Sequence, residues 1–286
     1  MSSGFTVGAA LRAAAEALAA RSESPQMEAQ VLLSRLLDLD RARLLAHPER
    51  TLTPAQRACY ESLVRQRAGG VPLPYLTGRR AFYRYEFVVS PEVLIPRPET
   101  EHLVEAGLAW AGAHAPHGEG LTLVDVGTGS GAIAVSLAAA LPRATVYATD
   151  ISPSALAVAH CNARRVGVAN VRFCQGHLLE ALPAAMSLDL VVANLPYVPS
   201  AELESLAVAR HEPRLALDGG PDGLRVIHQL LAQAPARVAP SFCLLLEIGA
   251  GQSEAVQELC RAAFPGARIR VIRDYAGHDR VIEVSK

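Results

Sequence analysis

A glycine-rich turn and an asparagine-containing tetrapeptide are the two features of the sequence whose residue types could do chemistry. Residues 125–131 read Asp-Val-Gly-Thr-Gly-Ser-Gly and residues 194–197 read Asn-Leu-Pro-Tyr, each directly after an apolar run. Glycines let the backbone turn sharply and approach a ligand closely, which side chains would prevent. Asp150 ends another apolar run, where its carboxylate can accept hydrogen bonds from ribose hydroxyls. The turn and this acid together predict a nucleoside site.

The turn also bears on which nucleoside cofactor is bound. Gly127, Gly129 and Ala132 fit the dinucleotide pattern G-x-G-x-x-G/A, so NAD is an alternative. Asp125 would repel a pyrophosphate and attract the positive centre of a sulfonium cofactor, which favours S-adenosylmethionine. Two plainer interpretations stay open: a purely structural glycine turn, and an Asp125 that only caps it.

The tetrapeptide carries the groups needed to hold a planar NH₂ group. An amide or exocyclic amine nitrogen is a poor nucleophile because its lone pair is conjugated. The Asn194 side-chain oxygen and the Leu195 carbonyl can each accept one N–H bond, which would aim the lone pair at a methyl donor. Pro196 restricts Leu195 to an extended conformation, and Tyr197 would add an aromatic wall for the substrate and the sulfonium. The alternative is a strand followed by an ordinary asparagine turn.

These segments need a scaffold, and the chain beyond residue 98 alternates apolar runs with helical stretches. Apolar runs lie at residues 121–126, 144–149, 171–174, 188–193 and 242–248. Such alternation predicts an α/β fold, a parallel sheet wound on both faces. Residues 268–272 and 280–284 are close enough in sequence to pair only as antiparallel neighbours. Because ligands bind beyond the carboxyl ends of the strands in such sheets, the turn and the tetrapeptide should meet there.

The first 70 residues carry a helical period and almost no β-branched runs, which predicts a small helical bundle. Ser24 followed by Pro25 is typical of a helix start, and Thr53-Pro-Ala-Gln fits a capping box. A Gly-Gly pair at residues 69–70 should end the last helix. Aromatic and β-branched residues at 81–89 predict a short hairpin.

Composition argues against several classes of protein and partner. The 286 residues allow about two domains, and 27 basic against 28 acidic residues give no global attraction to nucleic acid or membrane. Five cysteines without a C-x-x-C pair argue against a disulfide framework and a zinc site, and we expect no metal. No run approaches the ~18 apolar residues of a membrane span. We expect a monomeric cytoplasmic protein, with an arginine-rich segment over residues 1–80.

Taken together, the motifs resemble those of the release factor glutamine methyltransferases. These enzymes use S-adenosylmethionine to methylate the side-chain amide nitrogen, N5, of the glutamine in the Gly-Gly-Gln tripeptide of peptide chain release factors. The likeness spans nearly the whole chain, and its most specific part is Ile-Pro-Arg-Pro-Glu-Thr at residues 95–100. The other matching segments are residues 74–78, 94–101, 125–131, 194–197, 212–217 and 273–277.

The resemblance implies a domain layout and a partner. It implies a helical substrate-recognition domain over residues 1–75, a β-hairpin connector over 76–97, and a class I methyltransferase domain with a Rossmann-like seven-stranded sheet over 98–286. Release factors would be the protein partners, and no direct nucleic-acid or membrane partner is expected.

The resemblance further implies residue roles. Asn194, Pro196 and Tyr197 would be catalytic, and together with Leu195 they would hold the substrate glutamine. The cofactor would be bound by the glycine turn, by Asp150 on the ribose, by a segment near the adenine and by Asn194. In full, these residues are Gly127, Thr128, Gly129, Ser130, Gly131, Asp150, His177, Leu178 and Asn194.

Two positions depart from the pattern of the family. Leu195 stands where a proline is usual, but it keeps the carbonyl acceptor, so the chemistry should survive. His177 stands where an aspartate is usual; it can still accept from an adenine amino group, or it has only a surface or packing role.

The resemblance leaves the surroundings of the site open. Glu212, Pro213 and the turn at residues 218–223 form either a wall of the substrate cleft or simply a tight loop. Arg97 and Glu99 either help to close the cofactor pocket or make an internal ion pair.

Three other functions compete with this interpretation. Glutamine methylation of a large-subunit ribosomal protein would use the same chemistry. Adenine N6 methylation of ribosomal RNA is favoured by Leu195 but opposed by the acidic balance beyond residue 80. A cofactor-binding module that contacts translation factors without catalysis is the non-enzymatic alternative.

Overall fold

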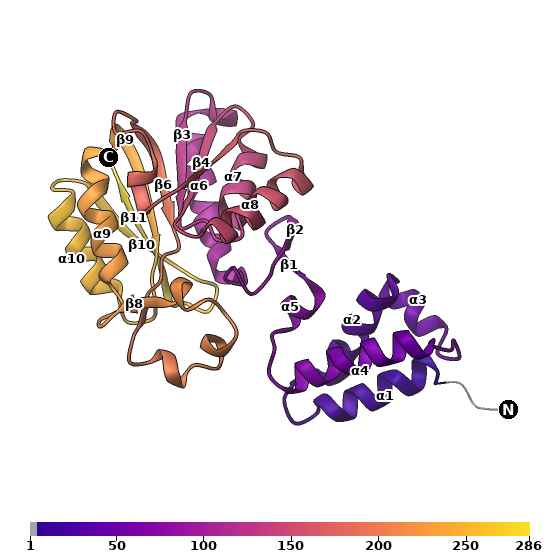
Figure 1. Cartoon of the computed structure of the whole chain (residues 1–286). Helices are drawn as coiled ribbons and strands as arrows, with labels where there is room; N and C mark the ends of the chain where they lie inside the picture. The colour runs from indigo at the N-terminus through magenta and orange to yellow at the C-terminus, as the bar shows by residue number, and fades with distance from the viewer. Residues whose placement is uncertain (1–4) are drawn as a thin grey trace. The chain divides into compact units, whose positions relative to one another are not determined.

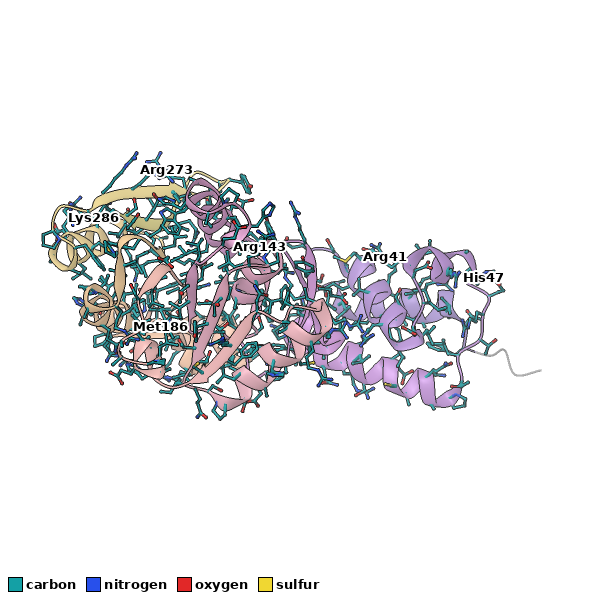
Figure 2. The ribbon with its side chains drawn as sticks, turned by 90° about the horizontal axis from the view of Figure 1, so that it is seen from above. Arg41, His47, Arg143, Met186, Arg273 and Lys286 are labelled. Atoms are coloured by element: carbon teal, nitrogen blue, oxygen red, sulfur yellow. The ribbon has the colours of Figure 1, made fainter. Side chains whose placement is uncertain are left out.

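The computed structural model describes residues 5–286, and its contacts divide the chain into two compact units, one ending at Arg79 and one spanning residues 80–286. Figure 1 traces the chain through both units. Figure 2 adds the side chains, with Arg41 and His47 marking the first unit and Arg143 and Arg273 the second. The predicted boundaries at 75/76 and 97/98 stay predictions.

The first unit is helical, as its periodicity predicts. Its helices are α1 (Val7–Leu18), α2 (Pro25–Leu37), α3 (Arg41–Ala46), α4 (Pro54–Ala68) and α5 (Leu73–Thr77). Leu18, Leu32 and Leu33 are fully buried and form the centre of its core. Their helical spacing places these side chains on inward faces.

The predicted boundaries of α4 are confirmed, but α4 is not the last helix of the unit, because α5 follows the Gly-Gly pair. The start of α2 shows a second difference. Both halves of the Thr53 capping box are present at the start of α4, and Gly69 is its C-cap. Ser24 does precede α2 with Pro25 at the first helical position, but its side chain makes no capping hydrogen bond within residues 5–286. The fixed φ of proline already suits the first turn, so this helix start does not depend on the hydroxyl.

The predicted hairpin is present as strands β1 (Arg79–Phe82) and β2 (Tyr85–Val88). Phe82 and Phe87 are buried and belong to a core cluster of the second unit. Asn162, on helix α8 (Pro153–Val166), accepts from the Val88 N–H at 2.7 Å and donates to the Val88 carbonyl at 2.9 Å. The hairpin therefore packs on the α/β unit.

A seven-stranded sheet forms the centre of the second unit, which confirms the predicted fold class. Its strand order is β10-β11-β9-β6-β3-β4-β5. The pairs from β9 to β5 are parallel, and β11 is antiparallel to both β9 and β10, as predicted for the end of the chain. The strands are β3 (Thr122–Val126), β4 (Thr145–Asp150), β5 (Val171–Gln175), β6 (Leu188–Ala193), β9 (Val238–Glu247), β10 (Arg268–Arg273) and β11 (Asp279–Ser285).

Helices cover both faces of this sheet (Figure 1). Helices α6 (Glu101–His114), α7 (Ala132–Ala140) and α8 pack on one face, and α9 (Arg225–Gln233) and α10 (Ser253–Ala263) pack on the other. Successive strand residues alternate between the two resulting cores, so Leu123 joins one cluster and Val124 the other. The strands are buried on both sides, which explains their nearly continuous apolar runs.

Short elements complete the second unit. A two-stranded parallel ribbon joins β7 (Val198–Pro199) to β8 (Asp218–Gly220). Single 3₁₀ turns lie at Pro98–Thr100, Pro116–Gly118, Leu178–Ala181, Leu203–Ser205, Ala207–Arg210, Arg214–Ala216 and Ala234–Ala236. None of the helices in the described part of the chain has the length and apolar character needed to span a membrane.

The strand order reverses between β3 and β6. The chain runs outward from β3 through β4 to β5, then returns to β6 on the other side of β3. Val126 and Ala193, the last residues of β3 and β6, are direct partners in the register. The glycine turn and the tetrapeptide therefore leave the sheet side by side, where α/β proteins bind ligands.

Candidate active site

The glycine turn is held to the neighbouring strand by backbone hydrogen bonds. The N–H groups of Gly127 and Thr128 both donate to the carbonyl of Thr149 at 2.9 Å. The Gly129 N–H donates to Asp150 Oδ2, also at 2.9 Å. These bonds fix the path of the turn across the carboxyl end of β4.

Gly129 and Gly131 both have positive φ, but they serve different purposes. At Gly129, with φ 54°, an added Cβ would meet open space among the described residues. At Gly131, with φ 79°, an added Cβ would come within 2.9 Å of the Ala159 Cβ on α8. Gly129 thus leaves room beside the turn, whereas Gly131 lets α7 approach α8 closely.

Asp125 is buried inside the turn and does not line the cavity beside it. Its Oδ2 accepts from the Thr128 hydroxyl at 2.6 Å and from the Ala134 N–H at 3.0 Å. Burial raises the pKa of this carboxyl to about 7, against the hydrogen bonds from Thr128 and Ala134, which lower it. The capping alternative describes Oδ2, whereas Oδ1 has no hydrogen-bond partner among the described residues. The preference of Asp125 for a sulfonium cofactor stays a prediction.

Asp150 lies at the end of β4 and lines the cavity. Each carboxylate oxygen accepts one backbone bond, Oδ2 from Gly129 and Oδ1 from Ser152 at 2.9 Å. Burial raises its pKa, while the backbone bonds lower it. An ionised carboxylate has about four lone-pair positions, so this oriented group can still accept from a ligand hydroxyl.

Asn194 follows β6 directly, and its side-chain nitrogen donates to the Thr100 hydroxyl at 3.1 Å. That bond commits the Nδ2 end of the amide and leaves the oxygen end to accept. Leu195 is buried, and its Cδ2 would lie 3.2 Å from a Cβ on Gly127, so the tetrapeptide and the glycine turn are in close contact.

Tyr197 does not line the cavity, in contrast to the preceding residues Asn194, Leu195 and Pro196. Its carbonyl accepts from Gln252 Nε2 at 2.9 Å. Burial raises the pKa of its hydroxyl to about 12, with the Glu247 charge adding to the effect, so the phenol is neutral. Its aromatic contact with a substrate stays a prediction.

A cavity of about 570 Å³ lies beyond the carboxyl ends of β3, β4 and β6. This volume is in the range of sites for small molecules and cofactors. Of the residues predicted from sequence, all but Gly131 and Tyr197 line it: Gly127, Thr128, Gly129, Ser130, Asp150, His177, Leu178, Asn194, Leu195 and Pro196. The structure thus brings the predicted cofactor and acceptor residues into one cavity.

His177 and Leu178 enter this wall from the segment after β5. Leu178 has a positive φ of 53°, an unusual conformation for a branched side chain. The following N–H, of Leu179, donates to Gln233 Oε1 on α9 at 2.9 Å, which ties the segment to the helix opposite.

Part of the cavity wall carries no signal that was recognised in the sequence. Ile151, and Arg225, Val226 and Gln229 of α9, also line the cavity. Their helical pattern is that of an ordinary amphipathic helix and carries no sign of a ligand. The one available signal was the turn at residues 218–223, because it leads directly into α9.

Of the two alternatives left open for Arg97 and Glu99, the internal ion pair is present at Arg97. Arg97 lines the cavity and pairs with Glu212, whose side chain is completely buried. Glu212 Oε2 also accepts from the Ile95 N–H at 3.0 Å. The carboxylate therefore links residues 95–97 to the loop between β7 and β8. No cluster of three or more potential metal ligands occurs in residues 5–286.

Comparison with known proteins gives matches over both units. Residues 9–78 match the family described as PrmC N-terminal domain, and residues 117–233 match a methyltransferase domain. Among solved structures, a methyltransferase from Pyrococcus furiosus is similar with a TM-score of 0.51 and 18% identity, covering 70% of this chain and 88% of that one. This likeness shows the fold.

Curated relatives match nearly end to end. A release factor glutamine methyltransferase from Moorella thermoacetica is 49% identical, covering 96% of this chain and 97% of the relative. One from Koribacter versatilis is 41% identical, covering 92% of each chain.

Proposed function

This chain belongs to the release factor glutamine methyltransferase family, and from that premise we propose that it transfers a methyl group from S-adenosylmethionine to N5 of the glutamine in the Gly-Gly-Gln motif of peptide chain release factors. The observation that carries the proposal is the joining of the glycine turn, Asp150 and Asn194 in one cavity.

The cavity suits a nucleoside cofactor with an amino-acid chain. The open space beside Gly129 admits a ligand close to the backbone of the turn. The Asp150 carboxylate, oriented by two backbone bonds, is suited to ribose hydroxyls. His177 and Leu178 would border the adenine. S-adenosylmethionine, when bound, supplies an electrophilic methyl group.

The acceptor residues suit a carboxamide. The Asn194 oxygen and the Leu195 carbonyl would each accept one N–H of the substrate glutamine, which orients its nitrogen and stabilises positive charge as it develops. A strong general base is not required, because orientation alone can contribute roughly 7–11 kcal/mol to lowering such a barrier. Pro196 restricts the direction of the Leu195 carbonyl.

The rim of the cavity suits a peptide rather than an isolated amino acid. Ile151 and Leu215 line it and are 50% and 59% exposed. Both side chains would be available to contact a peptide that enters the cavity. The first unit would make further contacts with the release factor.

Methyl transfer to purified proteins tests the proposal. The chain is incubated with S-adenosylmethionine labelled in the methyl group and a peptide chain release factor, and one labelled group per factor is expected. Replacing the glutamine of the Gly-Gly-Gln tripeptide should abolish labelling.

The competing acceptors are tested in parallel. Labelling of naked ribosomal RNA or of a large-subunit ribosomal protein at the same rate as the release factor would overturn the assigned substrate. No labelling of the release factor by an enzyme that binds the cofactor would overturn the proposed function.

A further inference from the structure

A chain of polar side chains leads from the acceptor asparagine into the core. Asn194 Nδ2 donates to Thr100 Oγ1 at 3.1 Å, and Thr100 and Tyr197 are the two side chains whose hydrogen bonding lowers the pKa of Glu247. The sheet brings the ends of this chain together, because Ala193 of β6 is the register partner of Leu246 of β9. Asn194 directly follows β6, and Glu247 is the last residue of β9, so both lie at the same edge of the sheet.

Glu247 is an unusual residue for this position. It is only 2% exposed, and its Oε2 has no hydrogen-bond partner among the described residues. Buried carboxyl groups are rare unless they are paired, so its presence calls for a physical reason. It does not line the cavity, whereas Thr100 and Asn194 do. Glu247 is therefore placed to act through Thr100 and without touching a ligand.

We propose that Thr100 and Glu247 are positioning residues that hold the Asn194 amide in the one orientation that turns its oxygen toward the substrate nitrogen. This role rests on the proposed methyl transfer to glutamine. Neither residue exchanges a proton with the substrate; both act on the direction of a hydrogen-bond chain.

The direction of the hydrogen bonds from Asn194 through Thr100 to Glu247 follows from the number of protons that these groups carry. An ionised carboxylate can only accept, so Thr100 must donate its single hydroxyl proton to Glu247. The Thr100 oxygen is then left as an acceptor, which selects the NH₂ end of the Asn194 amide. The amide oxygen is thereby left for the substrate.

Protonation of Glu247 removes this constraint. A neutral carboxyl can donate to Thr100, whose own proton is then free to bond the oxygen of Asn194 and to favour the flipped amide. Burial raises the pKa of Glu247 to about 7, while Thr100, Arg280 and Tyr197 lower it and Glu99 raises it. The Arg280 guanidinium also pairs with Asp274 at 3.0 Å. The orientation is thus enforced above a pH of about 7 and loosened below it.

The sequence allows a direct test, because the chain contains only three asparagines, Asn162, Asn170 and Asn194. Labelling asparagine with ¹⁵N gives three pairs of side-chain amide signals, which are followed by NMR between about pH 5.5 and 8.5. The Asn194 signals should shift with pH, and the midpoint of this shift should lie near the pKa of Glu247, about 7. Asn162 and Asn170 donate to backbone carbonyls and serve as internal controls that stay constant.

The near-isosteric variant Glu247→Gln tests whether Glu247 causes the pH-dependent shift of the Asn194 signals. In Glu247→Gln the pH-dependent shift of Asn194 should vanish while the control signals keep their positions. Asn194 signals that do not move with pH, or that move equally in Glu247→Gln, would overturn the proposal. This readout needs no methyl transfer, so it stands even if the proposed function fails.

Turnover gives the second readout. Thr100→Val should lower kcat about tenfold, the effect of one lost hydrogen bond, with a much smaller change in KM for the release factor. Thr100→Ser keeps the hydroxyl and should restore most of the rate. The wild-type kcat should rise with pH through about 7, and this inflection should be absent in Glu247→Gln. A Thr100→Val enzyme as fast as wild type would overturn the inference, whereas a wild type that leaves release factors unlabelled would overturn the proposed function.

Discussion

At the residue scale, the proposed chemistry depends most on which end of the Asn194 amide faces the cavity. Its nitrogen is committed to Thr100, and its oxygen is the group suited to accept from a carboxamide. In the proposed chemistry Leu195 would contribute through its backbone carbonyl, and its side chain packs beside Gly127. The replacement of the usual proline therefore leaves the acceptor set intact.

Asn194→Ala removes one of the two proposed hydrogen-bond acceptors and leaves the other residues that line the cavity unchanged. We expect kcat to fall by about 10²–10³-fold, as for the loss of one preorganised group in an active site. Cofactor affinity, measured by calorimetry, should be nearly unchanged because the glycine turn and Asp150 are untouched.

Leu195→Pro is the matched control for this tetrapeptide. It keeps the carbonyl acceptor while it restricts φ, removes the N–H and shortens the buried side chain, so the rate should change modestly. Turnover of Asn194→Ala equal to wild type would contradict the amide clamp, and a thousandfold gain in Leu195→Pro would show that φ restriction dominates.

Asp125 gives a pH prediction of definite sign. Its folded pKa of about 7 lies above the ordinary value of about 3.9 in an unfolded chain. At a pH between these two pKa values, Asp125 is protonated in the folded state and ionised in the unfolded state. Its contribution to stability is therefore greatest at low pH and is lost as pH rises toward 7.

Asp125→Asn cannot ionise and should lose this slope. Urea unfolding at about pH 5 and pH 8 should show that wild type loses more stability than Asp125→Asn on going to the higher pH, by roughly 1–4 kcal/mol. Glu247 ionises in both proteins and cancels in the comparison. Parallel pH dependences of the two proteins would contradict the raised pKa.

At the scale of the elements, the cavity wall is assembled from loops tied together by buried polar groups. Glu212, in the loop between β7 and β8, holds the Ile95 N–H and Arg97. Gly131 lets α7 approach α8 closely, which positions the start of α7 beside the turn. These ties keep irregular segments in place where no sheet or helix does so.

Glu212→Ala should break such a tie. It leaves the Arg97 charge and the Ile95 N–H without their partner, which should lower the free energy of unfolding by about 2–3 kcal/mol. The matched control is Arg214→Ala, which removes an exposed ion pair with Asp218 and should cost less than about 1 kcal/mol. Equal effects in urea unfolding would show that burial of Glu212 adds nothing.

At the scale of the whole molecule, the residues of the proposed active site and the predicted substrate-recognition helices belong to different units. All of the residues that line the cavity lie in the second unit, residues 80–286. That unit has its own two cores, one on each face of the sheet. The helical first unit has a separate core.

A fragment of residues 80–286 should therefore fold and bind S-adenosylmethionine with the affinity of the full chain. Its KM for a release factor should rise, because the proposed recognition by the first unit is missing. Calorimetry and methyl-transfer kinetics measure the two quantities. Loss of cofactor binding in a folded fragment would mean that the first unit contributes to the site.

Much of this architecture could be predicted from local sequence. The strands of the sheet are apolar runs separated by helical stretches, and burial on both faces requires this pattern. The hairpin, the α4 capping box and the antiparallel end of the chain follow from short-range patterns in the same way. The turn and the tetrapeptide could be expected to meet because parallel strands direct their carboxyl ends to one edge.

Tertiary structure alone decided the partners of the polar side chains. For Asp125, two interpretations were open, and only the tertiary structure showed that its Oδ2 caps the turn, because the direction of a side chain depends on the local path of the backbone. The contribution of α9 to the cavity and the contacts among Asn194, Thr100 and Glu247 join residues far apart in sequence. Periodicity and propensity describe neighbours along the chain, whereas hydrogen bonds and burial are set by neighbours in space.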